Sequence, residues 1–131
     1  MITFVDTNIL IDVFLPDPVF GEPSKEKLEQ AFENGSLVIN QIIYSELAPQ
    51  FGAKNLLDQT LTSLGIQVLS IDTDSAFQAG MLWRKYRLAG GKKNRIISDF
   101  LIGAHALNCS DALLTRDRGF YKTYFSDLSV I

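Results

Sequence analysis

Short apolar runs with β propensity alternate along the chain with segments of helical periodicity, and this alternation is the feature that most constrains the fold. Most of the predicted strands are apolar throughout, which is typical of parallel strands that are buried on both faces. Strands that alternate with helices in this way form a parallel sheet with helices packed on both sides. The sequence therefore predicts one α/β domain, with strands over residues 2–5, 37–39, 67–71, 112–114 and 129–131.

Capping residues and helix breakers set the expected helix ends. Four good N-caps stand directly before segments of helical periodicity: Ser24, Asn40, Asp72 and Ser98. A further helix is expected before Pro16, and Pro49 is expected to disturb the end of the helix that follows Asn40. Residues 17–23 are expected to form a loop between the first two helices.

Composition fits a packed domain and excludes several kinds of site. The 131 residues are 47% apolar and carry a net charge of −3, a balance typical of a globular protein of one-domain size. The lone Cys109 excludes an internal disulfide and a cysteine zinc site. The lone His105 excludes a histidine metal cluster and disfavours a Ser-His-Asp triad. We interpret His105 as a structural residue and Cys109 as a small buried hydrophobe, which leaves the carboxylates to carry the chemistry.

No stretch of the sequence indicates export or membrane insertion. Residues 1–15 contain Asp6 and Asp12 and lack the basic start of a signal peptide. The longest apolar runs are much shorter than the roughly 20 residues of a membrane-spanning helix. We therefore expect a cytoplasmic protein that has no membrane partner.

Charge is distributed unevenly along the chain. Residues 1–80 hold three bases and eleven acids, a net charge of −8, whereas residues 81–131 hold nine bases and four acids, a net charge of +5. Such segregation favours a polyanionic ligand for the second half. A solvated basic face is the alternative that charge alone leaves open.

Four carboxylates are expected near one edge of the sheet. Asp6 follows the first predicted strand and Asp117 follows strand 112–114, and ligands of open parallel sheets bind beyond the carboxyl ends of the strands. Glu46 lies in the helix after the second strand, and Asp99 lies at the start of a later helix. Each acid alone is also compatible with a helix cap, a turn or a solvated face. Their common placement favours one shared site.

Such an acidic pocket favours cation chemistry. Two carboxylates 4 Å apart repel by about 4 kcal/mol at an effective dielectric of 20, and hard divalent cations relieve this repulsion because they prefer carboxylate oxygens. A bound cation also lowers the pKa of a coordinated water, which then attacks as a nucleophile. The residues therefore favour a metal-dependent phosphodiesterase whose basic half contacts phosphate.

Four segments of the chain resemble the PIN domain and, more narrowly, the VapC-type toxins of toxin–antitoxin pairs. They are FVDTNIL (4–10), SEL (45–47), SDFLIGAHAL (98–107) and LLTRD (113–117). The segments occur in the order of the family and cover essentially the whole chain. The resemblance implies a single three-layer α/β/α domain over residues 1–131, with a central parallel sheet of about five strands.

The same resemblance implies an activity, Mg²⁺- or Mn²⁺-dependent endoribonuclease action on single-stranded segments of RNA. The acids that carry over as catalytic and metal-binding residues are Asp6, Glu46, Asp99 and Asp117. Asn8 and Thr115 match supporting positions, and Thr115 is expected to hydrogen-bond a carboxylate. The candidate RNA contacts are Lys92, Lys93, Arg95, Arg116 and Arg118. A homodimer and a neutralising antitoxin partner are also implied.

Other functions of α/β domains fit the residues less well. A phosphatase of the haloacid-dehalogenase type has two aspartates separated by one residue, but Asn8 stands where the second would be. A receiver domain has a paired acid near the first strand and a lysine after a late strand, and neither is found. A non-catalytic α/β module that binds RNA or protein remains the alternative to the nuclease.

Overall fold

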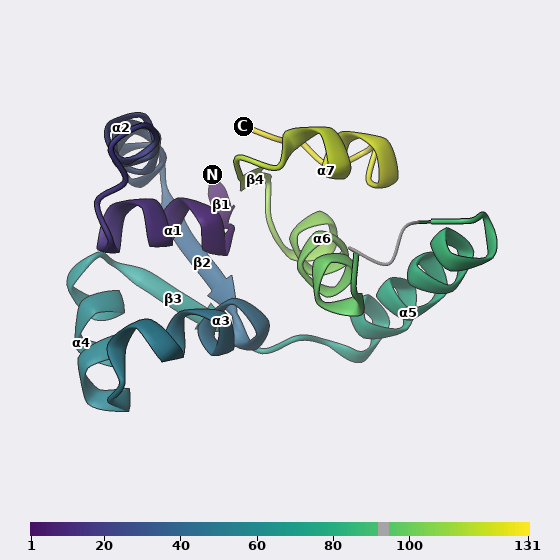
Figure 1. Cartoon of the computed structure of the whole chain (residues 1–131), viewed down its shortest axis with the longest axis horizontal. Helices are drawn as coiled ribbons and strands as arrows, with labels where there is room; N and C mark the ends of the chain where they lie inside the picture. Colours follow the sequence, from purple (N-terminus) through teal and green to yellow (C-terminus); the bar gives the residue numbers. More distant parts are fainter. Residues whose placement is uncertain (92–94) are drawn as a thin grey trace.

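Over the described residues, the sheet has four parallel strands in the order β3-β2-β1-β4 (Figure 1). The computed structural model describes residues 1–91 and 95–131, so the candidate RNA contacts Lys92 and Lys93 lie outside the described residues. The strands are β1 (Ile2–Val5), β2 (Ser36–Asn40), β3 (Ile66–Leu69) and β4 (Ala112–Leu114). In register, Phe4 of β1 lies opposite Val38 of β2 on one side and Leu113 of β4 on the other.

The fifth expected strand is reduced to a single bridge. Val130 pairs with Leu113 as an isolated parallel bridge, and Leu113 exchanges backbone hydrogen bonds with Ser129 and Ile131. Because β4 has only three residues, the C-terminal segment gains little further pairing along its edge. The predicted central parallel sheet is therefore confirmed, with four strands and one bridge among the described residues where about five strands were expected.

Helices fill every connection between the strands. They are α1 (Thr7–Phe14), α2 (Gly21–Glu33), α3 (Gln41–Phe51), α4 (Lys54–Ser63), α5 (Thr73–Leu88), α6 (Ile97–Cys109) and α7 (Arg118–Tyr124). The chain moves from β1 through β2 to β3 in one direction, and then crosses back to place β4 on the other side of β1. Since parallel crossovers are right-handed, this reversal puts α5 and α6 on the face opposite α1 to α4. Figure 1 shows the chain crossing between these two groups of helices in the segment from β3 to α5.

The helix ends confirm two predicted caps and correct two others. The side chains of Asn40 and Asp72 accept hydrogen bonds from the backbone N–H groups of Ile43 and Ser75, as expected of N-caps. In contrast, α2 begins at Gly21, because the Asp17 carboxylate accepts the N–H groups of Val19 and Phe20 and turns the chain early. The predicted loop over residues 17–23 is therefore shorter, and Ser24 lies inside the helix.

The other corrected cap concerns α6. Its N-cap is Ile96, so Ser98 lies in the first turn, where the Asp99 carboxylate accepts the Ile96 N–H at 3.2 Å. Pro49 also has less effect than expected, since α3 continues to Phe51 and ends at Gly52 with a left-handed φ of 70°.

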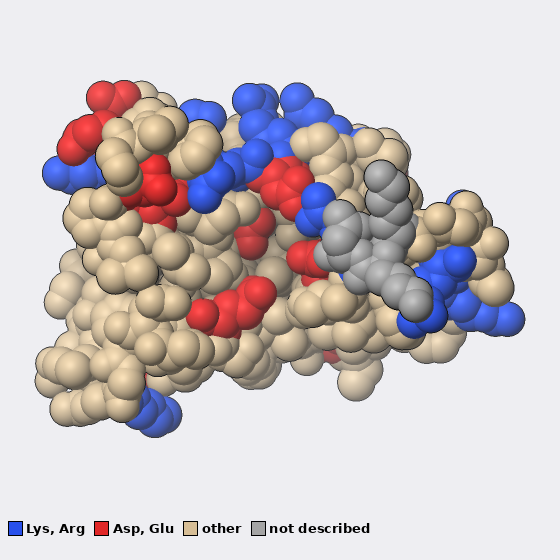
Figure 2. All heavy atoms as spheres, viewed as in Figure 1, with Lys and Arg blue, Asp and Glu red and all other residues tan. Residues whose placement is uncertain are grey.

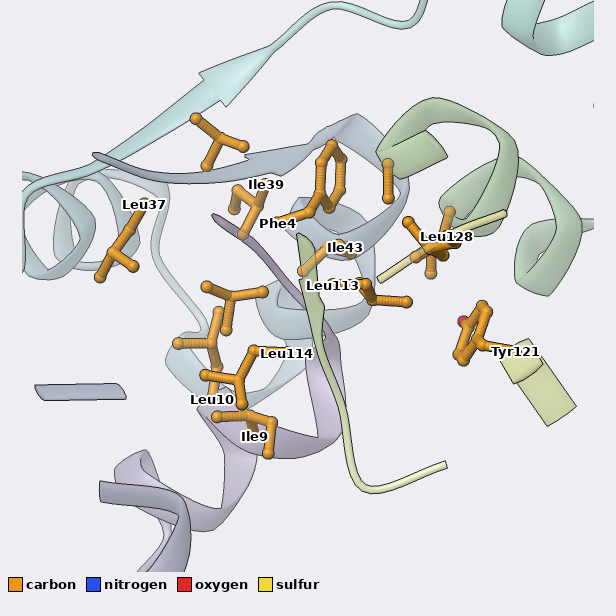
Figure 3. Packing of buried hydrophobic residues seen from close by; sticks show 14 of the residues in the cluster. Phe4, Ile9, Leu10, Leu37, Ile39, Ile43, Leu113, Leu114, Tyr121 and Leu128 are labelled. Atoms are coloured by element: carbon orange, nitrogen blue, oxygen red, sulfur yellow. The ribbon is translucent and has the colours of Figure 1, made fainter. Parts of the chain in front are cut away.

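The hydrophobic core lies between the sheet and both layers of helices (Figure 3). Phe4, Ile39 and Leu113 come from three neighbouring strands and are fully buried or nearly so. Ile9, Leu10 and Ile43 pack from α1 and α3, while Tyr121 and Leu128 close the other side. In the described part of the chain, no helix combines the length and apolar character that crossing a membrane requires. The reversal of strand order leaves a crevice at the carboxyl ends of β1 and β4.

Candidate active site

Asp6 lies at this crevice, directly after β1 and before the first turn of α1. Its Oδ1 accepts the Thr7 N–H at 2.8 Å, and its Oδ2 accepts the Thr115 hydroxyl at 2.7 Å and the Asn8 amide at 3.3 Å. Burial, with smaller contributions from the charges of Glu46 and Asp99, raises the pKa of Asp6 to about 6 against the lowering effect of its hydrogen bonds. The residue is only 6% exposed, so its charge depends on these few donors.

Thr115 links the two strand ends through one hydroxyl. It donates to Asp6, and it accepts the Asn8 amide at 3.3 Å and the Asp117 N–H at 3.0 Å. The hydrogen bond from Thr115 to a carboxylate is thus present. The three contacts fix the loop after β4 against the first turn of α1, because a hydroxyl has one proton to donate and two lone pairs to accept.

Glu46 and Asp99 face Asp6 from two further helices. The Glu46 carboxylate accepts the Thr7 hydroxyl at 2.7 Å on the exposed rim of α3. Partial removal from water and the charge of Asp99 raise the pKa of Glu46. Asp99 is half-buried in the first turn of α6, where removal from water and the charge of Asp117 raise its pKa.

Asp117 completes the acidic set but is already paired. Both of its oxygens accept hydrogen bonds from the Arg95 guanidinium, at 3.0 Å for the Nη2–Oδ1 contact, and the two side chains are about one-third exposed or less. The same guanidinium lies 4.3 Å from the centre of the Phe120 ring. Arg95 therefore lies at the border of the acidic site and is held there by a charge and by an aromatic face.

The four acids lie close enough to repel one another. Asp6 interacts electrostatically with Glu46 and Asp99, and Asp99 interacts with Asp117. Figure 2 shows acidic side chains gathered around a hollow near the centre of this face, with basic side chains above and to the right. The structure therefore brings together the four acids that the sequence placed at one edge of the sheet.

Tyr121 is a member of the site that the sequence reasoning missed. Its side chain in α7 is 2% exposed, and burial together with the charges of all four acids raises the pKa of its phenol. No sequence signal identifies it, because it lies among several aromatic residues of α7 that also belong to the core.

The donor set of this site fits a hard divalent cation. Four carboxylates supply only oxygen ligands, and the pKa of Asp6 is raised mainly by burial, with added repulsion from Glu46 and Asp99. The acids are spread over the crevice, which suits Mg²⁺ because this ion keeps several waters and binds through few carboxylates.

A second cluster of metal-ligand types lies elsewhere, on α5 and α6. Across residues 1–91 and 95–131, Asp72, His105 and Cys109 are the one group of three whose ligand atoms all lie within 4.8 Å of one another. The Asn40 Oδ1 caps α3, so its Nδ2 donates to His105 Nδ1 at 3.2 Å. A neutral imidazole then carries its proton on Nε2 and offers no lone pair for a metal. This geometry disfavours a metal site there.

For two residues of that cluster, His105 and Cys109, the sequence predicted a structural role, and the structure confirms it for His105 alone. His105 is 1% exposed and packs edge-on against Phe4, with ring centres 5.1 Å apart, so its role is structural. Cys109 is only partly buried, and its thiol lies 3.6 Å from Asp72 Oδ1. The interpretation of Cys109 as a buried hydrophobe is therefore corrected, because its place in the last turn of α6 leaves it near the exposed start of α5.

The remaining candidate RNA contacts differ in their surroundings. Arg116 is bidentate to Asp12, at 2.6 and 3.0 Å, and its guanidinium lies 4.1 Å from the centre of the Phe20 ring. Its backbone N–H also donates to Asn8 Oδ1 at 3.1 Å. Arg118 is exposed in the first turn of α7. Arg116 is thus engaged within the fold, whereas Arg118 is exposed and lines concavities that it shares with Lys27 of α2.

Comparisons with known proteins agree with this geometry. Residues 3–126 match the family model of the PIN domain. VapBC2 from Rickettsia felis, bound to a fragment of its promoter DNA, is 22% identical with a TM-score of 0.76, covering 100% of this chain and 98% of that chain. VapBC-1 from nontypeable Haemophilus influenzae is 25% identical with a TM-score of 0.71, covering 100% and 97%. A toxin–antitoxin complex from Klebsiella pneumoniae is 23% identical with a TM-score of 0.67, covering 98% and 95%. No curated protein is significantly similar to the chain in sequence.

Proposed function

Because the chain belongs to the PIN domain family, we propose that it is a metal-dependent endoribonuclease and the toxin of a toxin–antitoxin pair. The observation that carries the proposal is the buried Asp6, which shares the carboxyl edge of the sheet with three more acids and is held by Thr115. Among the described residues, Arg95 is the one cation that forms an ion pair with these four acids, and four mutually repelling carboxylates fit cation binding better than a purely structural role.

The four acids would hold Mg²⁺ or Mn²⁺, with Asp6 and Asp99 as the main ligands and Glu46 and Asp117 completing the pocket directly or through water. The ion supplies an activated water and charge stabilisation for phosphodiester hydrolysis. Thr115 and Asn8 orient Oδ2 of Asp6, since the Thr115 hydroxyl and the Asn8 amide both donate to this oxygen. The Asn8 amide also donates to the Thr115 hydroxyl. Thr7 does the same for Glu46 through its hydroxyl.

The RNA strand would lie across the basic side chains that border the acids. Arg95 and Arg118 are the described candidates for phosphate contacts, with Lys92 and Lys93 in the same basic segment as Arg95. We assign Arg116 mainly to holding the loop after β4, because its guanidinium is bidentate to Asp12. Salt dependence of RNA binding would report the number of phosphate contacts.

The proposed partners follow from the similar structures. Two of them are VapBC structures and the third is described as a toxin–antitoxin complex, which supports an antitoxin partner for this chain. We further propose a single PIN domain over residues 1–131, a homodimer, and a cytoplasmic site of action where RNA and the antitoxin are present.

The test is cleavage of single-stranded RNA by purified protein with Mg²⁺, with Mn²⁺ and with a chelator. We expect cleavage only with metal, and loss of at least 100-fold in rate for Asp99→Asn, because one ligand and its charge are removed. Asp127→Asn is the matched control, since this acid is exposed and lies outside the site. Metal-independent cleavage, or equal rates for the two variants, would contradict the proposal and favour a non-catalytic binding module.

A further inference from the structure

A second concavity opens beside the acidic site, between the end of α5, the turn at residues 89–91 and α7. Its volume is about 770 Å³, and its walls combine aromatic rings, glycines and cations. The side chains that define its character are Lys85, Tyr86, Arg95, Phe120 and Tyr124. Among the described residues that line it, none is acidic. We propose that this aromatic cleft binds one nucleotide of a single-stranded RNA, next to the phosphate that is cleaved at the acids.

The aromatic wall is rigid and partly open to solvent. Tyr124 is 40% exposed, and its ring lies 5.3 Å from that of Tyr86 and 5.2 Å from that of Phe120. Both neighbours are buried and belong to the core. Because two buried rings pack against the Tyr124 ring, its position is restrained while part of it stays exposed, and every RNA base can stack on an aromatic ring without sequence preference.

The cations of the cleft suit the phosphate groups of the same strand. Lys85 is exposed on α5, and Arg95 lies over the Phe120 ring. A cleft that carries positive charge and aromatic rings but no acid fits a polyanion with flat bases better than an acidic peptide, which would leave the ring unused.

Arg95 makes the cleft continuous with the acidic site. One side of its guanidinium contacts Phe120 in the cleft, while its Nη atoms bind Asp117 in the acidic set. A strand whose phosphate lies at the carboxylates therefore has the cleft as the neighbouring position. This inference rests on the proposed function, since it assigns a subsite to the same RNA.

The experiment is RNA binding in a catalytically silenced background. Fluorescence anisotropy of a labelled single-stranded oligoribonucleotide is measured with Asp99→Asn protein in chelator, and again with an oligomer that contains one abasic nucleotide at each position in turn. Tyr124→Ala and Lys85→Ala are compared with Tyr124→Phe, which keeps the π face. Phe32→Ala is the matched control, because this exposed ring on α2 lines no part of the cleft.

We expect Tyr124→Ala to weaken binding about tenfold and to remove the penalty of one abasic position, since base stacking on an aromatic side chain has about this effect. Tyr124→Phe and Phe32→Ala should bind like the parent. Lys85→Ala should weaken binding and lower the slope of log affinity against log salt by about one. Arg95 is left unchanged because it also binds Asp117.

Two results overturn the inference: parental affinity for both Tyr124→Ala and Lys85→Ala, or a preference of the cleft for an acidic peptide over RNA. These results leave the proposed function standing if the wild-type protein still cleaves RNA with metal. Conversely, wild-type protein that neither binds nor cleaves RNA removes the proposed function together with the subsite. Lys85 is exposed, so its variant keeps the test decisive even if Tyr124→Ala unfolds.

Discussion

Two arginine–aspartate pairs flank the acidic site, and they differ in the burial of their carboxylates rather than in chemistry. Arg116 and Asp12 form one bidentate pair, in which the Arg116 side chain is 36% exposed and the Asp12 side chain is 3% exposed. Arg95 and Asp117 form the other, in which the side chains are 26% and 34% exposed. Both guanidinium groups also lie over a phenylalanine ring. A pair with a buried carboxylate resists separation because that charge would remain in the interior, whereas a pair of partly exposed side chains exchanges more readily with water and ions.

This difference assigns the pairs to different tasks. Asp12 also accepts the Ser24 hydroxyl at 2.6 Å, so the buried pair ties α1, α2 and the loop after β4 together. That loop carries Thr115, which holds Asp6. Arg95 instead donates hydrogen bonds to the carboxylate of Asp117, which is a candidate metal ligand. The first pair therefore builds the site, and the second is an internal cation that competes for it.

The largest expected effect is a difference in the free energy of unfolding between variants of the two pairs. Arg116→Ala should lower the free energy of unfolding by about 3 kcal/mol, because it leaves the buried Asp12 carboxylate without its cation. Arg95→Ala is the comparison and should cost less than about 1 kcal/mol, as for an exposed pair. Urea denaturation of the metal-free proteins measures both. Equal losses for the two variants would remove the distinction between them.

The next effect concerns the charge at Asp6. Its pKa is raised to about 6 from 3.8, so its ionised form destabilises the fold, and stability is gained as pH falls through 6 towards 4. Between pH 7.5 and pH 4.5, wild-type protein should gain about 2 kcal/mol relative to Asp6→Asn. Urea denaturation in chelator at both pH values gives this difference, and subtraction of the variant removes the contributions of other titrating groups. Parallel pH profiles for the two proteins would contradict the assignment.

A smaller effect tests how Asp12 is held. Ser24→Ala removes one hydrogen bond to the buried carboxylate and should cost about 1.5 kcal/mol, the value typical of a hydrogen bond to a charged group. Thermal or urea unfolding measures it, with Ser45→Ala as the control, because the Ser45 hydroxyl bonds only the backbone carbonyl of Ile42 on an exposed face. If the two serine variants lose the same stability, the link between α1 and α2 does not depend on Asp12.

The smallest expected effect concerns metal affinity. Arg95→Ala frees Asp117, so Mn²⁺ should bind about threefold more tightly, which corresponds to an exposed ion pair of about 0.6 kcal/mol. Isothermal titration calorimetry measures the affinity. Arg118→Ala controls for the loss of one positive charge near the site without the loss of a carboxylate partner. A larger gain for Arg118→Ala than for Arg95→Ala would show that net charge, not competition at Asp117, governs binding.

Much of the fold follows from local signals in the sequence. The four strands fall within or close to the predicted runs, and the caps at Asn40 and Asp72 are present because each side chain acts on the backbone only three residues away. Ser24 failed as a predicted cap for the opposite reason. Its hydroxyl binds Asp12, twelve positions earlier, and a local rule does not include that partner.

The candidate site, like the fold, could be predicted from the sequence only in part. Asp6 and Asp117 could be placed at one edge because Asp6 directly follows β1 and Asp117 comes three residues after the end of β4 in a parallel sheet. Tyr121 and Tyr124 could not be told apart from the other aromatic residues of α7, although one faces the acids and the other lines the cleft. The pairing of Arg95 with Asp117 was equally hidden, because the sequence shows only a basic segment.

The amino-acid order by itself determined the alternation of strands and helices and the sheet edge at which the acids gather, and its single cysteine and single histidine cannot form clusters of their own kind. Only the tertiary structure decided which cation neutralises which acid. Asp12 and Arg116 lie 104 positions apart and meet because the strand order reverses beside β1. Charge pairing depends on distance and burial in space, and neither is encoded in the spacing of residues along the chain.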